Sequence, residues 1–181
     1  MITEKETIRC EAVFNEDRTH RVLWKRVWNK DKPLAMVLML NPSQADSLVS
    51  DMTTFLVVNN ITRLEKYGGV VISNLFSQLT PKLNFRWHPD EELNCPENDT
   101  YIRKAAEECE IIILGWGKGV KDNQRVLDRI EMVKELLSDC KEKFAVISDG
   151  ENRGMHPLTP SIRSQWVLEP YEEETDPSSE K

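Results

Sequence analysis

The sequence predicts an α/β protein: a three-layer α/β/α sandwich around a mostly parallel sheet, preceded by an N-terminal β-hairpin. From Leu34 onward, short apolar runs alternate with amphipathic stretches, as in strands joined by crossover helices. The runs are apolar throughout, which is typical of parallel strands buried on both faces. The chain of 181 residues has the length of one domain.

The hairpin is predicted from residues 7–14 and 21–28, which are rich in β-branched and aromatic residues and enclose the polar stretch 15–20. Residues 21–28 also fit a short helix, because their pattern follows neither period cleanly. Both alternatives stay open for this segment.

The later elements follow in order. Gly68 is expected to end the first helix, because glycine is the usual residue just past a helix C-terminus. Right-handed crossovers between parallel strands place helices on both faces of the sheet. The expected strands are 34–40, 69–73, 111–115, 144–147 and 165–168, and the expected helices are 53–67, 98–108 and 123–140.

Composition argues against a membrane protein. Hydrophobic residues make up 39% and charged residues 30% of the chain, and no apolar run reaches the roughly 18 residues of a membrane span. The charged N-terminus differs from a secretory signal, so we expect a cytoplasmic protein. The four cysteines are not spaced like zinc ligands or a disulfide framework, so we expect free thiols, no metal and no cofactor.

Acidic residues are concentrated at the C-terminus. Residues 169–181 hold six acids and one lysine, a net −5 of the total −7, which leaves the body at −2. We expect residues 1–168 to form a single domain and 169–181 to be a disordered tail, because Pro, Ser and acids offer little to bury. Alternatives are self-inhibition, with tail carboxylates mimicking phosphates, and contact with a protein partner.

Polar residues follow each predicted strand. In open α/β sheets, ligands bind beyond the carboxyl ends of the strands, so these loops are expected to form one polar site. The polar segments are 41–46, 74–77, 116–119, 148–150 and 155–158.

The loop after the first parallel strand supplies several candidates. Asn41 and Ser43 are candidate ligand-binding residues, although both also suit a turn and helix cap. Asp51 is either a helix N-cap or a catalytic carboxylate. Asp46 has no evident structural role in the sequence and is therefore a candidate catalytic residue.

Three further loops add candidates. Asn74 ends a buried strand with a donor and an acceptor, which suits reading of a base edge, or it pins the next loop. The segment around Trp116 and Gly117 is too sparse for a phosphate loop, but its glycines permit close approach of a ligand. His156, with Arg153 nearby, is a candidate acid, base or hydrogen-bond donor.

Motifs spread from about Arg18 to Pro160 carry a family resemblance. In their order they resemble a bacterial and phage family called domain of unknown function 1643 (DUF1643), which implies no established activity. The motifs are residues 40–46, 51–53, 67–69, 74–76, 96–99, 116–117 and 156–158.

The same loops also resemble, more distantly, those of the uracil-DNA glycosylase superfamily. The resemblance implies that Asn74 reads a flipped base, with Phe76 beside it among the ligand-binding residues. His156 would stabilise negative charge on the carbonyl oxygen of the base, and Asp46 or Asp51 would orient water toward C1′ of the sugar. A local basic strip of Arg153, Arg163 and Lys118 would face DNA.

Three functions are therefore compared. The first is a DNA glycosylase-like enzyme that cleaves or recognises the N-glycosidic bond of a normal or modified base, with DNA or a nucleotide as partner. The alternative is a non-catalytic domain that binds a nucleotide or small ligand. The third is an interaction protein that uses its acidic tail or Trp24 and Trp28. The sequence indicates neither the base nor the oligomeric state.

Overall fold

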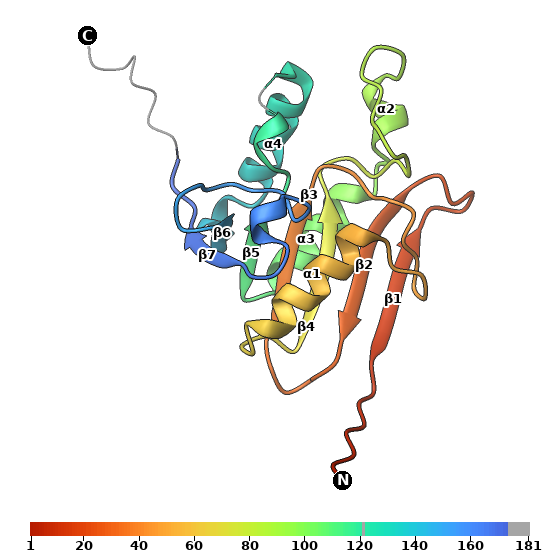
Figure 1. The fold of residues 1–181 in the computed structure, drawn as a ribbon. Helices are drawn as coiled ribbons and strands as arrows, with labels where there is room; N and C mark the ends of the chain where they lie inside the picture. Colours follow the sequence, from red (N-terminus) through yellow and green to blue (C-terminus); the bar gives the residue numbers. More distant parts are fainter. Residues whose placement is uncertain (121, 174–181) are drawn as a thin grey trace.

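The computed structural model describes residues 1–120 and 122–173, which contain one seven-stranded sheet in the order β1-β2-β4-β3-β5-β6-β7 (Figure 1). The four central strands β4, β3, β5 and β6 are parallel, and β1, β2 and β7 run antiparallel to their neighbours. The strands are β1 Arg9–Phe14, β2 Arg21–Val27, β3 Leu34–Met39, β4 Gly69–Asn74, β5 Ile111–Leu114, β6 Phe144–Ser148 and β7 Val167–Pro170.

The α/β class is confirmed, but the prediction of a mostly parallel sheet is wrong, because the sheet is mixed. The β1–β2 hairpin joins the sheet by antiparallel pairing of β2 with β4. At the other edge, β7 returns on β6 through a segment without a crossover helix, and such a connection gives an antiparallel neighbour. The N-terminal hairpin itself is confirmed, and the helical alternative for residues 21–28 is wrong.

The helices begin close to the predicted positions, but two end elsewhere. The helix α1 stops at Arg63, and Glu65, with φ of 56°, takes the left-handed position expected of Gly68. The stretch 123–140 divides into α4 and a 3₁₀ segment, and α2 was not predicted. The helices are α1 Met52–Arg63, α2 Asp90–Leu93, α3 Asn98–Glu108 and α4 Gln124–Leu136, with 3₁₀ segments at η1 Lys118–Val120, η2 Ser138–Lys143 and η3 Pro160–Ile162.

Gly68 is required by close backbone approach instead. Its amide donates to the Pro33 carbonyl, and its carbonyl accepts from the amides of Trp28 and Asn29. A Cβ atom at this position would lie 1.8 Å from the Asn29 carbonyl oxygen. Any side chain here would therefore push apart the segments that connect β2 to β3 and α1 to β4.

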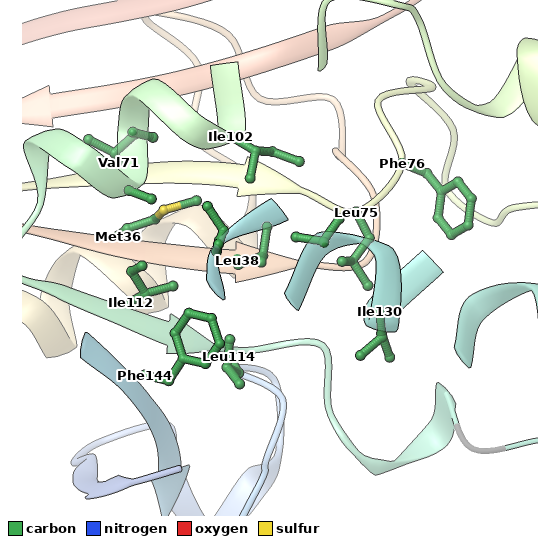
Figure 2. Close-up of a cluster of buried hydrophobic side chains, with 14 of the residues drawn as sticks. Met36, Leu38, Val71, Leu75, Phe76, Ile102, Ile112, Leu114, Ile130 and Phe144 are labelled. Atoms are coloured by element: carbon green, nitrogen blue, oxygen red, sulfur yellow. The ribbon is translucent and has the colours of Figure 1, made fainter. Parts of the chain in front are cut away.

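Side chains of the central strands alternate between two hydrophobic clusters. Met36 and Leu38 of β3 point to the cluster that contains Ile102 of α3 and Ile130 of α4 (Figure 2). Alternate residues of the same strand belong to the second cluster, with Val57 and Ile61 of α1. The helix α1 therefore covers one face of the sheet, and α3 and α4 cover the other (Figure 1).

The last described residues are attached to the sheet. Glu169 and Pro170, which begin the predicted tail, lie in β7, and the Tyr171 amide donates to the Phe144 carbonyl. The remainder of the predicted tail, residues 174–181, lies outside the described residues. Among the helices of the described residues, none combines the length and hydrophobicity of a membrane span.

Candidate functional site

Strand register brings the predicted loops to one edge of the sheet. Met39 of β3 is level with Asn74 of β4, and Leu38 is level with Leu114 of β5. The chain leaves β3 toward β4 on one side and leaves β5 toward β6 on the other, so the topological switch point lies between β3 and β5. The loops after these strands flank the crevice in which open α/β sheets bind ligands.

Within this edge, residues 41–51, named the first loop, bind one another and the neighbouring segments of the chain. Asp51 is the N-cap of α1: one carboxylate oxygen accepts from the Thr54 amide at 2.8 Å, and the other accepts from the Ser43 hydroxyl. The Asn41 amide group donates to the Thr80 carbonyl at 2.7 Å. The capping and turn interpretations of these residues match their contacts.

Asp46 has a structural role that the sequence does not reveal. One of its carboxylate oxygens accepts from the amides of Leu48 and Val49, both at 2.8 Å, and these hydrogen bonds lower the pKa of Asp46. Its carbonyl accepts from the Trp24 indole nitrogen at 2.7 Å. Asp46 therefore closes a tight turn and attaches the first loop to the hairpin.

Arg21, a residue missed by the sequence analysis, is buried beneath the first loop. Its side chain donates to the Ala45 carbonyl at 2.5 Å, and the residue is 1% exposed. Burial lowers the pKa of Arg21 to about 10, and the Asp51 carboxylate opposes this shift. Two Arg21 nitrogens and the Asn74 amide nitrogen are buried without a hydrogen-bond partner among the described residues. The only sequence signal for Arg21 is a charged residue at the start of an apolar strand.

Phe76 lies in the hydrophobic core. It is 2% exposed and belongs to the cluster covered by α3 and α4 (Figure 2). Its ring meets the Phe85 ring edge-on with 5.4 Å between ring centres. In this position Phe76 supports the loop after β4 and offers no exposed face for stacking.

A second group of predicted residues forms an open pocket of about 760 Å³, here named the His156 pocket. It contains the predicted residues His156, Trp116 and Gly117. Asn74 and the residues of the first loop are not among the described residues that line it. The predicted single polar site is therefore divided between the first loop and this pocket. The lining residues are Trp116, Gly117, Lys118, Gly119, Asp149, Asn152, Met155, His156, Thr159 and Ser161.

The contacts of His156 define which ring nitrogen carries hydrogen. Nδ1 accepts from the Leu158 amide at 3.1 Å, so the neutral ring carries its hydrogen on Nε2. Burial lowers the pKa of His156 below its ordinary 6.5, so the ring is neutral near pH 7. His156, which lines the pocket, therefore has a neutral ring whose donor is Nε2–H.

Gly117 positions the histidine ring through close contact. Its φ is +79°, and a Cβ atom there would lie 2.8 Å from the His156 Cβ atom. The glycine thus lets the loop after β5 pack directly against the loop after β6.

Asp149 is the pocket carboxylate that the sequence analysis did not select. One oxygen accepts from the amides of Glu151 and Asn152 at 3.1 and 2.8 Å, and the other accepts from the Ser161 hydroxyl at 3.0 Å. The backbone hydrogen bonds lower the pKa of Asp149 to about 2, so it stays ionised. The available signal was its place directly after a buried strand, shared with Asn41 and Asn74.

The residues of the predicted basic strip lie in different environments. Arg153 pairs with Glu169 and Glu172 at 2.9 and 2.8 Å and lines a neighbouring groove rather than the His156 pocket. Arg163 donates to the Leu158 carbonyl at 2.9 Å, and Lys118 lines both the pocket and the groove.

The described residues offer no candidate metal site and no exposed cluster of thiols. No group of three or more His, Cys, Asp or Glu side chains among them is arranged to hold a metal ion. The four cysteines are free, and Cys95, Cys109 and Cys140 are buried.

Comparison with known proteins gives one match. A family model described as "Protein of unknown function (DUF1643)" matches residues 21–158, which run from β2 to Leu158 in the loop after β6. Searches of curated proteins and of solved structures return no match.

The tautomer and charge of His156 are open to direct measurement. We expect ¹⁵N NMR to show a neutral ring with hydrogen on Nε2 that titrates below 6.5, because burial penalises the charged form. The stability gained by burying the neutral ring is present above pH 6.5 and is lost as the pH falls toward the folded-state pKa. A His156→Gln variant assigns the signal, and titration above 6.5 would contradict the prediction.

Replacement of Gly117 tests the contact between the two loops. We expect Gly117→Ala to lower the free energy of unfolding by about 1–3 kcal/mol, because it combines a left-handed backbone with a clash against His156. Gly119→Ala is the matched control, since a Cβ atom there meets nothing within 4 Å. Urea denaturation measures both variants, and equal stability for the two would be the contrary result.

Proposed function

We propose that this chain, which belongs to the DUF1643 family, binds a planar, carbonyl-bearing ring such as a nucleobase in the His156 pocket. The observation that carries the proposal is the neutral His156, whose Nδ1 is held by the Leu158 amide so that Nε2–H is the donor. Trp116 adds an aromatic ring to the same pocket. A concave pocket that combines an aromatic side chain with a few directed polar groups is typical of small-molecule sites.

The polar groups of the pocket complement those of a base. The His156 donor suits a ring carbonyl, and the ionised Asp149 carboxylate suits a ring N–H. Stacking of a base on an aromatic side chain contributes about 1–3 kcal/mol, and it tolerates different bases because each has a π-face. The chemistry of the pocket thus favours base recognition without selecting a particular base.

The relation to the uracil-DNA glycosylase superfamily stays part of the proposal. Helices on both faces of the sheet support a three-layer α/β/α architecture of that kind. Asn74, Asp46 and Asp51 lie outside the lining of the His156 pocket, which favours recognition over cleavage. The pairing of Arg153 with two carboxylates favours a nucleotide or free base over duplex DNA. Four free cysteines support a cytoplasmic location.

Hydrolysis of an N-glycosidic bond is the second candidate, and Asp149 favours it. An ionised carboxylate in the same pocket as a neutral Nε2–H donor can orient water toward C1′ while the donor stabilises the base oxygen. The bond from C1′ to the base nitrogen breaks, the water oxygen bonds to C1′, and the water proton passes to the departing base. Asp149 would take the role that the resemblance to the uracil-DNA glycosylase superfamily implies for Asp46 or Asp51.

Base binding is tested by calorimetric titration with free nucleobases and nucleoside monophosphates. We expect saturable binding that His156→Ala weakens by about 3- to 10-fold through loss of one hydrogen bond. Trp116→Leu should weaken it by about 5-fold or more through loss of stacking. The exposed His88→Ala and Trp87→Leu are matched controls that leave affinity unchanged. Absence of binding by the folded wild-type protein would remove the proposal.

Cleavage is tested by abasic-site formation on DNA that carries uracil or modified bases. If the protein cleaves, Asp149→Asn and His156→Ala should abolish product, and Asp46→Asn should retain it, because among the described residues the Asp46 carboxylate accepts only from amides of its own turn. The absence of abasic product on all substrates would reject hydrolysis and leave base binding in place.

A further inference from the structure

A groove adjoins the His156 pocket and is here named the Tyr171 groove. Trp116, Gly117 and Lys118 line both hollows and form the wall between them. The groove has a volume of about 920 Å³, and its apolar lining includes Leu114 at the end of β5 and Ile130 of α4. A ligand that crosses the wall would contact both hollows.

Basic side chains around the groove are paired with carboxylates from the last described residues. Arg153 Nη1 lies 2.8 Å from a Glu172 carboxylate oxygen. The Nζ atoms of Lys141 and Lys134 lie 3.6 and 3.9 Å from the same oxygen of Glu173. Two acids from one end of the chain thus meet three cations from separate elements.

Tyr171 anchors the segment that carries these acids. Its amide donates to the Phe144 carbonyl, its ring meets the Phe144 ring edge-on, and Lys134 Nζ lies 5.4 Å from its ring centre. Beyond this anchor, the side chains of Glu172 and Glu173 are 75% and 65% exposed. Ion pairs this exposed are weak, so the two carboxylates can exchange with another anion.

We propose that the Tyr171 groove is a phosphate-binding site, and that Glu172 and Glu173 occupy its cations as internal competitors when phosphate is absent. Carboxylate and phosphate oxygens accept the same hydrogen bonds from guanidinium and ammonium groups, and phosphate carries more charge. The ligand class is a nucleoside phosphate, with its base in the His156 pocket and its phosphate across the Trp116 wall. The placement of the base rests on the proposed function; the phosphate site does not.

Charge around the groove favours this exchange. With Glu172 and Glu173 displaced, the described lining of the groove keeps the cations Lys118, Lys134 and Arg153 against one acid, Glu131. Arg153 still pairs with Glu169, which lies outside that lining. The groove then attracts anions even though the whole chain has a net charge of −7. The C-terminal acids would thus set the ligand concentration at which the site fills.

The test is calorimetric titration of the full chain with pyrophosphate at low salt. Glu172→Gln/Glu173→Gln should tighten pyrophosphate binding by about 3- to 20-fold, as expected for release of two exposed ion-pair networks. Glu4→Gln/Glu6→Gln is the matched control, with the same change in net charge at the exposed N-terminus (Figure 1). The proposal would be overturned if both double variants gained affinity for pyrophosphate equally, or if Glu172→Gln/Glu173→Gln did not bind pyrophosphate.

Further variants locate the anion. In the Glu172→Gln/Glu173→Gln background, Arg153→Gln and Lys134→Gln should each cancel most of the gain, and thermal melting verifies that they fold. Retention of the gain in both would place the anion elsewhere and overturn the proposal. A protein that binds pyrophosphate but no base would uphold the phosphate site and refute the base pocket.

Discussion

The position of β3 between β4 and β5 is the constraint on which the candidate site depends. Parallel pairing on both sides makes these three strands end at the same level, with Met39 opposite Asn74 and Leu38 opposite Leu114. Both faces of the strands are buried by helices, so the chain becomes polar only where the strands stop. The loops that carry Asn41, Asn74 and Trp116 therefore emerge at one edge whatever their own sequences are.

The two halves of this edge use their polar groups differently. In the first loop, one Asp46 carboxylate oxygen accepts from the amides of Leu48 and Val49, and the two Asp51 carboxylate oxygens accept from Thr54 and Ser43, which fixes the loop and the start of α1. In the loop after β6, the His156 ring accepts a backbone hydrogen bond at Nδ1, from the Leu158 amide. A group that is positioned by one atom and open at another suits binding, because its orientation is fixed before the ligand arrives.

The sequence predicts local secondary structure well but predicts poorly how strands and distant segments pair with one another. The strand and helix positions follow from apolar periodicity, and Asp51 as an N-cap follows from its place before an amphipathic stretch. The direction of the strands outside the parallel centre does not follow from the sequence, because β2 and β7 carry no pattern that distinguishes parallel from antiparallel neighbours. Gly68 resembled a helix cap because close backbone approach from a distant segment is invisible in sequence.

Because contacts between segments are not visible in the sequence, the candidate site was also predicted only in part. His156, Trp116 and Gly117 were predicted from their loop positions, and they lie together in one pocket. Asp46 was chosen because no local role was evident, yet its hydrogen bonds to Leu48 and Val49 are local and depend on how the loop turns. Asp149 was passed over although it follows a strand in the same way. Residue type and the positions of strand ends identify the edge of the sheet where the site lies. Tertiary contacts then decide which side chains there are free to bind a ligand.

Net charge is a poor guide to which anions this protein can bind, because its cations differ in how exchangeable their partners are. Arg21 is fully buried, its pKa is lowered to about 10, and the first loop lies over it, so its charge serves the fold. Arg153 is 41% exposed, and its partner Glu172 is exposed still further. The cost of removing Arg21 from water is part of the folded state and does not change when a ligand binds. At Arg153, an added anion can replace the exposed Glu172 carboxylate at little cost while Glu169 stays paired. In this acidic chain, we therefore expect anions to bind at exposed cations that are paired with the chain's own exposed carboxylates.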